Sequence, residues 1–209
     1  MLGLPGSTGR FTPAEILAAL NAYKGIDTAR LKAHLFYFLS EVVPVAESLG
    51  LKMAVHPDDP PYPVLGLPRI VSTAQDLQEI TASVPSPANG FCFCSGSLGV
   101  RPDNDLLDII TQLGAHIHFL HLRNTRRDAQ GNFFEADHLN GDVDMVAVVQ
   151  ALLLLMKKRK IALPVRPDHG HQLLDDHTKN TYPGYSAIGR LKGLAELRGL
   201  QRGLASILS

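Results

Sequence analysis

The sequence lacks an excess of charge of either sign. Twenty Lys and Arg residues balance twenty Asp and Glu residues, so the formal net charge is +0. This balance gives no electrostatic reason to expect nucleic acid or an anionic membrane as a partner. With 45% hydrophobic and 19% charged residues among 209, the composition is typical of a soluble globular domain that buries a sizeable core.

Cysteines and long apolar runs are also scarce. Cys92 and Cys94 lie too close together in one extended segment to suggest a disulfide framework, so we expect a reducing, cytoplasmic location. The longest apolar run, residues 145–156, is broken by Gln150 and is too short to span a bilayer. The first ten residues lack the basic-then-apolar layout of a signal peptide, and no repeat with a period of about 20 to 50 residues is visible.

Two helices are predicted before the first strand. Residues 12–15 form a capping box with proline at the first helical position, and Gly25 follows that helix. A longer helix is predicted over residues 28–49, ended by Gly50 and kinked at Pro44.

From residue 52 onward, a strand, a polar loop and a helix follow one another four times. The predicted strands are residues 52–56, 90–94, 117–122 and 163–167. The predicted helices are residues 72–84, which open with a capping box at Ser72, residues 105–113, residues 142–159 and a final helix from Ala187. Residues 95–104 and 123–141 are predicted to be loops. Serial units of this kind argue for a parallel sheet with outer helices.

The polar residues collect after each strand and before each helix, where parallel sheets and β/α barrels carry their sites. A complete barrel needs about 250 residues, and only four strands are visible. We therefore expect an α/β fold, a partial TIM (β/α)8 barrel, in which residues 1–209 form a single domain that is half of a barrel.

The carboxyl ends of the four strands carry metal-binding side chains. Strand alternation groups His56 with Ala54, Cys94 with Cys92, His121 and Arg123 with Ile117 and Phe119, and Asp168 with Arg166. Each strand thus delivers one possible ligand: His56, Cys94, His121 and Asp168. Two imidazoles, a thiolate and a carboxylate suit zinc, ferrous iron or manganese. Taken singly, each has a structural alternative, such as a buried cysteine acting as a small hydrophobe. Their joint occurrence favours a metal site.

The last strand leads into a dense polar stretch. Residues 166–171 contain an arginine, a carboxylate and two imidazoles, and Gly170 is predicted to permit a sharp turn. A solvated loop with local hydrogen bonds is the alternative, because structural and functional polar clusters look alike in sequence.

Several motifs, in order, resemble the mannonate dehydratase family from about Leu4 to the C-terminus. They are Ala54-Val55-His56-Pro57-Asp58-Asp59-Pro60-Pro61, residues 89–97, His121-Leu122-Arg123, His138-Leu139-Asn140-Gly141-Asp142, Arg166-Pro167-Asp168-His169-Gly170-His171 and Pro183-Gly184-Tyr185-Ser186-Ala187-Ile188-Gly189-Arg190. The resemblance implies a xylose-isomerase-like barrel that uses Mn²⁺ or Fe²⁺ to dehydrate D-mannonate, a sugar acid, to 2-keto-3-deoxy-D-gluconate in glucuronate catabolism. The family's metal ligands fall on the same four residues, and its catalytic histidine and tyrosine fall on His169 and Tyr185.

The implied reaction removes a proton α to a carboxylate, which needs a base, an acid for the departing hydroxyl and stabilisation of negative charge. His169 and Tyr185 are the candidates for proton transfer, in either order. Arg123 and Arg166 either clamp the substrate or pair with acidic loop residues, namely Asp58, Asp59 or Asp142. His138 is a further candidate for substrate contact, whereas His116, His118 and His177 are expected to be surface or core groups.

Members of that family extend beyond this chain at the N-terminal end. Four open strands would leave two unpaired sheet edges, so we expect homo-oligomerisation or association with the missing N-terminal half. The alternative function is an inactive remnant or a half-barrel that needs a partner chain. A related sugar isomerase is a third option, which the Pro-Asp-His-Gly-His and Pro-Gly-Tyr motifs disfavour.

Overall fold

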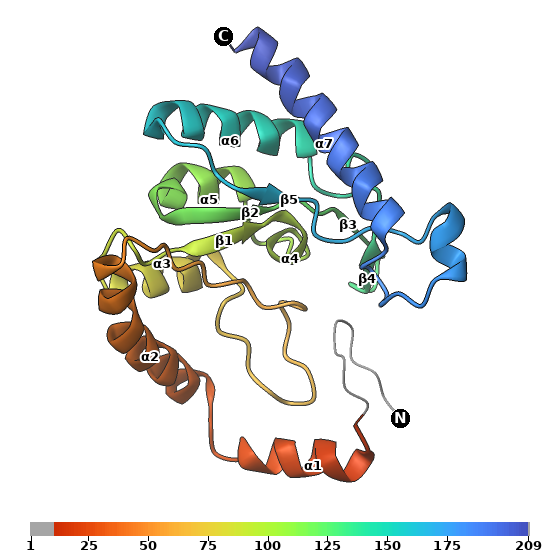
Figure 1. The fold of residues 1–209 in the computed structure, drawn as a ribbon. Helices are drawn as coiled ribbons and strands as arrows, with labels where there is room; N and C mark the ends of the chain where they lie inside the picture. Colours follow the sequence, from red (N-terminus) through yellow and green to blue (C-terminus); the bar gives the residue numbers. More distant parts are fainter. Residues whose placement is uncertain (1–10, 209) are drawn as a thin grey trace.

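The computed structural model describes residues 11–208, so the expectation for the first ten residues lies outside the described part. A three-stranded parallel sheet occupies the centre, in the order β1 (Phe91–Cys94), β2 (Ile117–His121), β5 (Val165–Arg166) (Figure 1). The predicted first strand is reduced to one parallel bridge between Val55 and Phe91. Backbone N–H groups of Met53 and Val55 still donate to the segment before β1, at 2.8 and 3.0 Å. The described residues therefore form an open sheet.

Helices surround this sheet, and all of the described ones but the first bury residues against it or against one another. They are α1 (Pro13–Ala22), α2 (Thr28–Ser48), α3 (Ala74–Ser83), α4 (Ser95–Gly99), α5 (Leu106–Leu113), α6 (Met145–Arg159) and α7 (Ala187–Ile207), with 3₁₀ turns η1 (Gly114–His116) and η2 (Leu174–Thr178). Successive contacts run from α2 to α3, α5, α6 and α7 (Figure 1). Helix α1 buries none of its residues. No described helix is long and apolar enough to cross a membrane.

Most predicted helix boundaries are confirmed, with two shifts at the N-termini. Thr12 and Glu15 form the expected capping box, and α2 continues through Pro44. Helix α3 is capped by Thr73 rather than Ser72, because Asp76 completes the box three residues after Thr73. Helix α6 is capped by Asp144, whose carboxylate accepts from the Ala147 N–H at 3.0 Å. The Asp142 predicted there instead accepts from Arg127.

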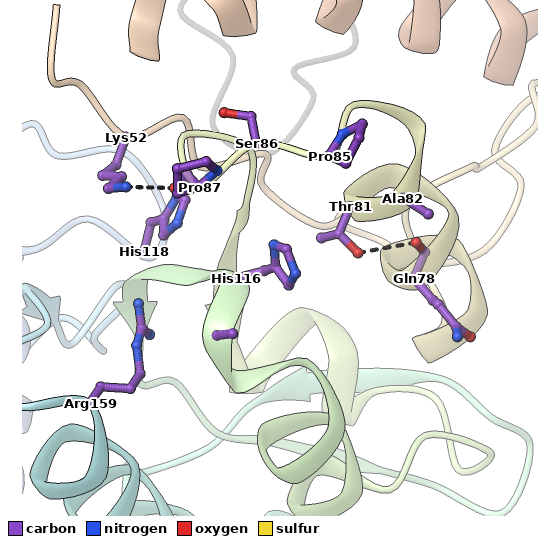
Figure 2. A pocket seen from close by; sticks show the side chains of 11 residues that line it. Lys52, Gln78, Thr81, Ala82, Pro85, Ser86, Pro87, His116, His118 and Arg159 are labelled. Atoms are coloured by element: carbon purple, nitrogen blue, oxygen red, sulfur yellow. Dashed lines mark hydrogen bonds between the residues drawn. The ribbon is translucent and has the colours of Figure 1, made fainter.

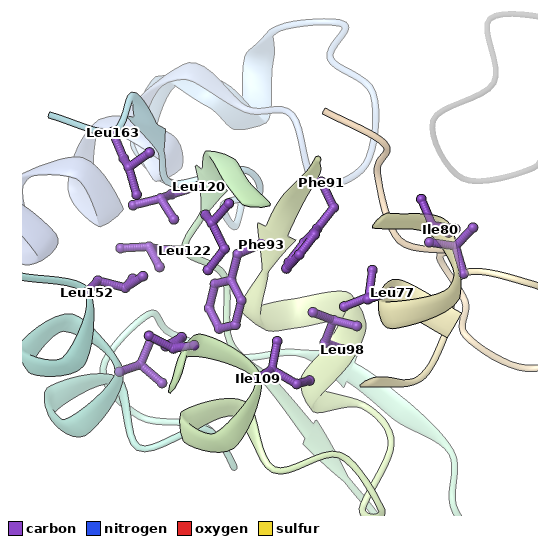
Figure 3. Close-up of a cluster of buried hydrophobic side chains, with 14 of the residues drawn as sticks. Leu77, Ile80, Phe91, Phe93, Leu98, Ile109, Leu120, Leu122, Leu152 and Leu163 are labelled. Atoms are coloured by element: carbon purple, nitrogen blue, oxygen red, sulfur yellow. The ribbon is translucent and has the colours of Figure 1, made fainter. Parts of the chain in front are cut away.

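The hydrophobic core lies between the sheet and the helices (Figure 3). Phe91 and Phe93 alternate with Cys92 and Cys94 along β1 and are fully buried. They pack in one cluster with Leu77 of α3, Ile109 of α5 and Leu152 of α6. Burial of apolar surface at this junction holds the strands in place, which leaves the opposite face of the sheet to carry polar groups.

A register shift in β2 changes the predicted alternation. Phe91 pairs with Ile117 but Cys92 pairs with Phe119, so one residue of β2 is extra between the two pairs. Ile117 is consequently buried in the core, and the prediction that it shares a face with His121 is wrong. Beyond the shift, His121 pairs with Cys94 on the face away from the core.

The segment predicted as a long loop contains a hairpin, β3 (Thr125–Arg127) paired with β4 (Phe133–Glu135). Asn124 anchors its base: its side-chain amide donates to the carbonyls of His138 and Val143 and accepts from the Val143 N–H at 3.0 Å. Gly141 lies so close that an added Cβ would be 2.2 Å from the Asn124 Oδ1. The glycine of the His138–Asp142 motif is therefore explained by its packing against Asn124.

Candidate functional site

Four side chains converge at the carboxyl end of the sheet. They are His56, Cys94, His121 and Asp168, and their donor atoms lie within 4.8 Å of one another. We call this group the ligand cluster. His56 Nε2 lies 3.0 Å from His121 Nδ1, His121 Nδ1 lies 3.5 Å from Asp168 Oδ1, and the Cys94 thiol is 3.9 Å from Asp168 Oδ2. The four residues come from four separate segments, as predicted.

The donor set and spacing fit one divalent cation. Donor atoms about 2.0–2.3 Å from a shared ion are at most about 4.6 Å apart, close to the observed spread. The Nδ1 of His56 is hydrogen-bonded to the Pro57 carbonyl at 2.6 Å. The other ring nitrogen, Nε2, is therefore the one that can coordinate a metal ion. The cluster can therefore hold a metal ion with little rearrangement.

Burial sets the protonation states inside the cluster. Burial, and then the charge of Asp168, raises the pKa of the Cys94 thiol to about 11, although two hydrogen bonds from Ser97 oppose the shift. Burial lowers the pKa of His121 to about 4 despite the nearby Asp168 carboxylate. The metal-free cluster at neutral pH thus has a protonated thiol and a neutral imidazole. A bound cation would displace the thiol proton.

Asp168 reaches the cluster through a turn rather than through strand alternation. Strand β5 ends at Arg166, and Asp168 has φ 63°, a left-handed conformation that Asp tolerates better than most residues. Its carboxyl pKa is lowered: burial acts in the opposite direction, but His169, His121 and neighbouring arginines outweigh it. The prediction that Gly170 makes the turn is wrong. Gly170 instead permits close contact with Gly189 of α7, whose carbonyl carbon would lie 2.4 Å from an added Cβ.

His169 and Tyr185 form a pair beside the ligand cluster. His169 Nε2 lies 3.2 Å from the Tyr185 hydroxyl, and the ring centroids are 4.8 Å apart in an edge-on arrangement. His169 Nε2 is also 3.9 Å from Asp168 Oδ2. The two predicted proton-transfer groups therefore contact each other and adjoin the Asp168 carboxylate of the ligand cluster.

The three residues predicted to contact substrate differ in exposure. Arg166 donates to Asp168 at 2.8 Å and its side chain is 44% exposed, so its guanidinium is accessible beside the cluster. Arg123 is buried and donates to Glu135 and Asp59. Its pKa is raised, because the two carboxylates outweigh the opposing effect of burial. His138 is also buried, and its Nε2 lies 2.8 Å from the Pro167 carbonyl.

Of the acidic partners expected for Arg123, only Asp59 makes the contact. Asp58 accepts from the N–H groups of Ile70 and Val71, each at 2.8 Å, and Asp142 pairs with Arg127. The remaining partner of Arg123 is Glu135, which the sequence reasoning missed.

Glu135 joins Arg123 to His169. Its Oε2 is 3.1 Å from His169 Nδ1, and Arg123 Nε lies 2.9 and 3.0 Å from its two oxygens. Burial would raise the pKa of Glu135, but the bond to His169 and the charge of Arg123 lower it overall. The available signal was the turn-forming Gly131-Asn132 followed by two phenylalanines, which indicates a hairpin.

A hollow lies at the opposite end of the sheet from the ligand cluster, near the start of β2 (Figure 2). Its volume is about 580 Å³. Its basic side chains contact backbone carbonyls: Lys52 to Pro87 at 2.6 Å, His116 to Asn89 at 3.1 Å, His118 to Met53 at 2.5 Å and Arg159 to Gly114 at 2.7 Å. These contacts explain the residues structurally, as expected for His116 and His118.

Comparison with known proteins identifies the sequence family. A family model described as D-mannonate dehydratase (UxuA) matches residues 1–208. A mannonate dehydratase from Marinomonas sp. (strain MWYL1) is 54% identical over 212 residues, which cover 99% of this chain and 54% of that protein. One from Saccharophagus degradans is 48% identical over 205 residues, covering 95% of this chain and 52% of that protein. The chain spans about half the length of these curated relatives.

Solved structures show the same relationship. The crystal structure of mannonate dehydratase from Streptococcus suis serotype2 matches with a TM-score of 0.85 and 34% identity, covering 95% of this chain and 57% of that one. A xylose isomerase domain protein from Planctomyces limnophilus matches with a TM-score of 0.59 at 14% identity, covering 83% of this chain and 55% of that one. The second likeness concerns the fold alone. The predicted fold class, a partial barrel of the xylose-isomerase-like type, is confirmed.

Proposed function

Because the chain belongs to the D-mannonate dehydratase family, we propose that it acts in the metal-dependent dehydration of D-mannonate to 2-keto-3-deoxy-D-gluconate, a hydro-lyase step of glucuronate catabolism. The observation that carries this proposal is the contact between the His169–Tyr185 pair and Asp168 of the ligand cluster. Proton-transfer groups beside a metal-binding carboxylate are what the elimination requires.

The ligand cluster would hold Mn²⁺ or Fe²⁺ through His56, Cys94, His121 and Asp168. When bound, the cation supplies Lewis-acid stabilisation of the negative charge that develops on the substrate carboxylate. The mixed nitrogen, sulfur and oxygen donors suit these borderline metals.

His169 and Tyr185 would move the two protons of the elimination. One of them takes the proton from C2, and the other protonates the departing C3 hydroxyl. Their 3.2 Å contact allows a proton to pass between them, so either order returns the pair to its starting state.

Arg166 is our first candidate for binding the substrate carboxylate, because its guanidinium is exposed beside Asp168. Arg123 and His138 are buried and would hold in place the residues that contact the substrate. Arg123 connects Asp59 to Glu135, and His138 holds the Pro167 carbonyl just before the Asp168 turn.

The partner we propose is a polypeptide equivalent to the half of the relatives that this chain does not match, or a second copy of the chain. The open edges at residues 53–55 and at β5 favour such a partner, because their unpaired backbone N–H and C=O groups can hydrogen-bond to a further strand. We place the reaction in the cytoplasm because both cysteines are free. An inactive remnant is not favoured, because the matching family and relatives are named as dehydratases.

The test is a dehydration assay with D-mannonate and added Mn²⁺, following the 2-keto product. The purified chain is assayed alone and together with the matching N-terminal half of a curated relative. Product from either sample supports the proposal. A complex that binds Mn²⁺ but forms no product from D-mannonate would contradict it.

A further inference from the structure

We propose that Glu135 is a positioning residue for proton transfer: its carboxylate fixes the His169 tautomer that carries a proton on Nδ1, so that Nε2 accepts a hydrogen bond from the Tyr185 hydroxyl. This inference rests on the proposed function, which it deepens by assigning a direction to the hydrogen bonds of the catalytic pair.

The direction follows from the chemistry of a carboxylate. Glu135 Oε2 is 3.1 Å from His169 Nδ1, and an ionised carboxylate has no proton to donate. His169 Nδ1 must therefore be the donor, and in a neutral imidazole the other nitrogen is then an acceptor. His169 Nε2 lies 3.2 Å from the Tyr185 hydroxyl, which is the group able to donate to it.

Arg123 stabilises the carboxylate form of Glu135, which can only accept hydrogen bonds. Its Nε lies 2.9 and 3.0 Å from the two carboxylate oxygens, and its Nη1 contacts Asp59. The Arg123 side chain is 6% exposed, and its guanidinium has no lone pair with which to accept a hydrogen bond. A proton on Glu135 would have to displace these charge-assisted bonds.

The hairpin presents the carboxylate from a fixed position. Glu135 ends β4 and pairs with Thr125 of β3, and the next N–H, of Ala136, donates to Asn124 at 3.0 Å. Asn124 itself is buried and anchored to His138 and Val143. The carboxylate is thus carried by a braced strand end, which suits a group whose purpose is orientation.

Glu135→Gln tests the proposal with almost no change in volume. Arg123 only donates and its Nε lies nearest the Oε1 position, at 2.9 Å, so the amide oxygen should take that position and the amide NH₂ the Oε2 position, which faces His169 Nδ1. That arrangement forces the imidazole proton to Nε2. An equivalent carboxylate-to-amide change in the serine protease triad leaves the geometry intact but gives the wrong tautomer.

The measurement is ¹⁵N NMR of histidine-labelled, metal-free protein, with His169 assigned by loss of its signals in His169→Gln. The parent should show protonated Nδ1, and Glu135→Gln should show protonated Nε2. Asp137→Asn is the matched control, because Asp137 is on the same segment but contacts Lys192 and His171. It should keep the parent tautomer. A parent with protonated Nε2, or a Gln variant with protonated Nδ1, overturns the proposal.

Kinetics of the assembled enzyme provide the second readout. Glu135→Gln should lower kcat at least about tenfold while KM changes less than about twofold, because the contact affects proton transfer and not substrate binding. Asp137→Asn should retain parental kcat. If Glu135→Gln does not fold, Glu135→Ala, which neither donates nor accepts, should give both tautomers, and a pure Nδ1–H signal there overturns the proposal. An inactive parent whose tautomer still depends on Glu135 would refute the proposed function alone.

Discussion

Cys94 is the most deeply buried member of the ligand cluster, and its Sγ accepts hydrogen bonds from the Ser97 N–H and hydroxyl at 3.4 and 3.2 Å. Cys94→Ser should lower Mn²⁺ affinity at least about tenfold, since a serine hydroxyl does not ionise to replace the thiolate. Titration with Mn²⁺, read by electron paramagnetic resonance of the free ion, measures the change.

Cys92→Ser is the control for this experiment. Cys92 is buried two residues earlier in β1 but does not belong to the ligand cluster. Its variant should bind Mn²⁺ as the parent does. Equal affinity for the parent and Cys94→Ser would count against Cys94 as a ligand.

His118 makes stability depend on pH at the other end of the sheet. Burial is the main cause that lowers its pKa, with Lys52 and Arg159 adding to the shift against an opposing bond to the Met53 carbonyl. The unfolded chain, with a histidine pKa of about 6.5, therefore binds the proton first. This contribution to stability is complete above pH about 6.5 and is lost as the pH falls through the lowered value.

Denaturant unfolding measured at several pH values between about 7.5 and 5 should show this loss of stability. His118→Gln should reduce the slope of the free energy of unfolding against pH. A glutamine amide can still donate to the Met53 carbonyl, so the hydrogen bond is kept while the titration is removed. His177→Gln, at an exposed position of η2, should leave the slope as in the parent. An unchanged slope in His118→Gln would refute the assignment.

Helix α7 supports the Asp168 turn through two glycines in contact. An added Cβ on Gly189 would lie 1.9 Å from the His171 carbonyl oxygen, and one on Gly170 would lie 2.4 Å from the Gly189 carbonyl carbon. Asp176 of η2 adds a cap, accepting from the N–H of Ile188 at 3.0 Å. The Pro-Gly-Tyr-Ser-Ala-Ile-Gly-Arg motif thus joins the helix N-terminus to the loop that carries Asp168.

Gly189→Ala should lower the free energy of unfolding by about 1–3 kcal/mol, because overpacking forces the loop away from the helix. Gly199→Ala, in the same helix with nothing within 4 Å of an added Cβ, should raise it by about 0.5–1 kcal/mol. Thermal and urea unfolding of both variants measures the difference. A Gly189→Ala variant as stable as Gly199→Ala would show that the loop can move freely.

The described residues form an open sheet whose outer segment, residues 53–55, pairs with β1 and the residues just before it. The N–H groups of Met53 and Val55 donate to Ala88 and Gly90, and the Val55 carbonyl accepts from the Cys92 N–H. Strand alternation directs the Ala54 N–H to the other side, toward the open edge. Ala54→Pro should therefore keep the bonds to β1 and weaken binding of a companion half at least about tenfold, because proline has no N–H to donate.

Sedimentation of the chain mixed with the N-terminal half of a relative measures this association. The parent should form a one-to-one complex, and Ala54→Pro should require higher concentrations. Its melting temperature when alone should match the parent, which would show that the chain's own fold is intact. Equal association of both chains would exclude this edge as the contact.

Much of the architecture could be predicted because its signals are local. Capping residues set the starts of α1, α2 and α5. Apolar runs placed three of the four strands, and their ends brought His56, Cys94, His121 and Asp168 together as expected. Parallel strands end at one edge, so the order of polar residues along the chain was enough to gather them.

Other features depended on contacts between distant segments. The extra residue in β2 shows only in its pairing with β1, and the pairing of Glu135 with His169 requires a hairpin to fold onto the Asp168 turn. The local sequence predicted a turn at Gly170. In the structure this glycine instead allows close contact with Gly189, which the local sequence does not indicate.

The sequence by itself determined which residues are available as ligands and proton-transfer groups, because residue type and strand order are written along the chain. Only the tertiary structure decided how they are oriented. Arg123 became a buried link between Asp59 and Glu135, Arg166 stayed exposed, and Asp168 turned inward at φ 63°. The physical reason is that a side chain's direction and partners depend on packing between segments, which local propensities do not encode.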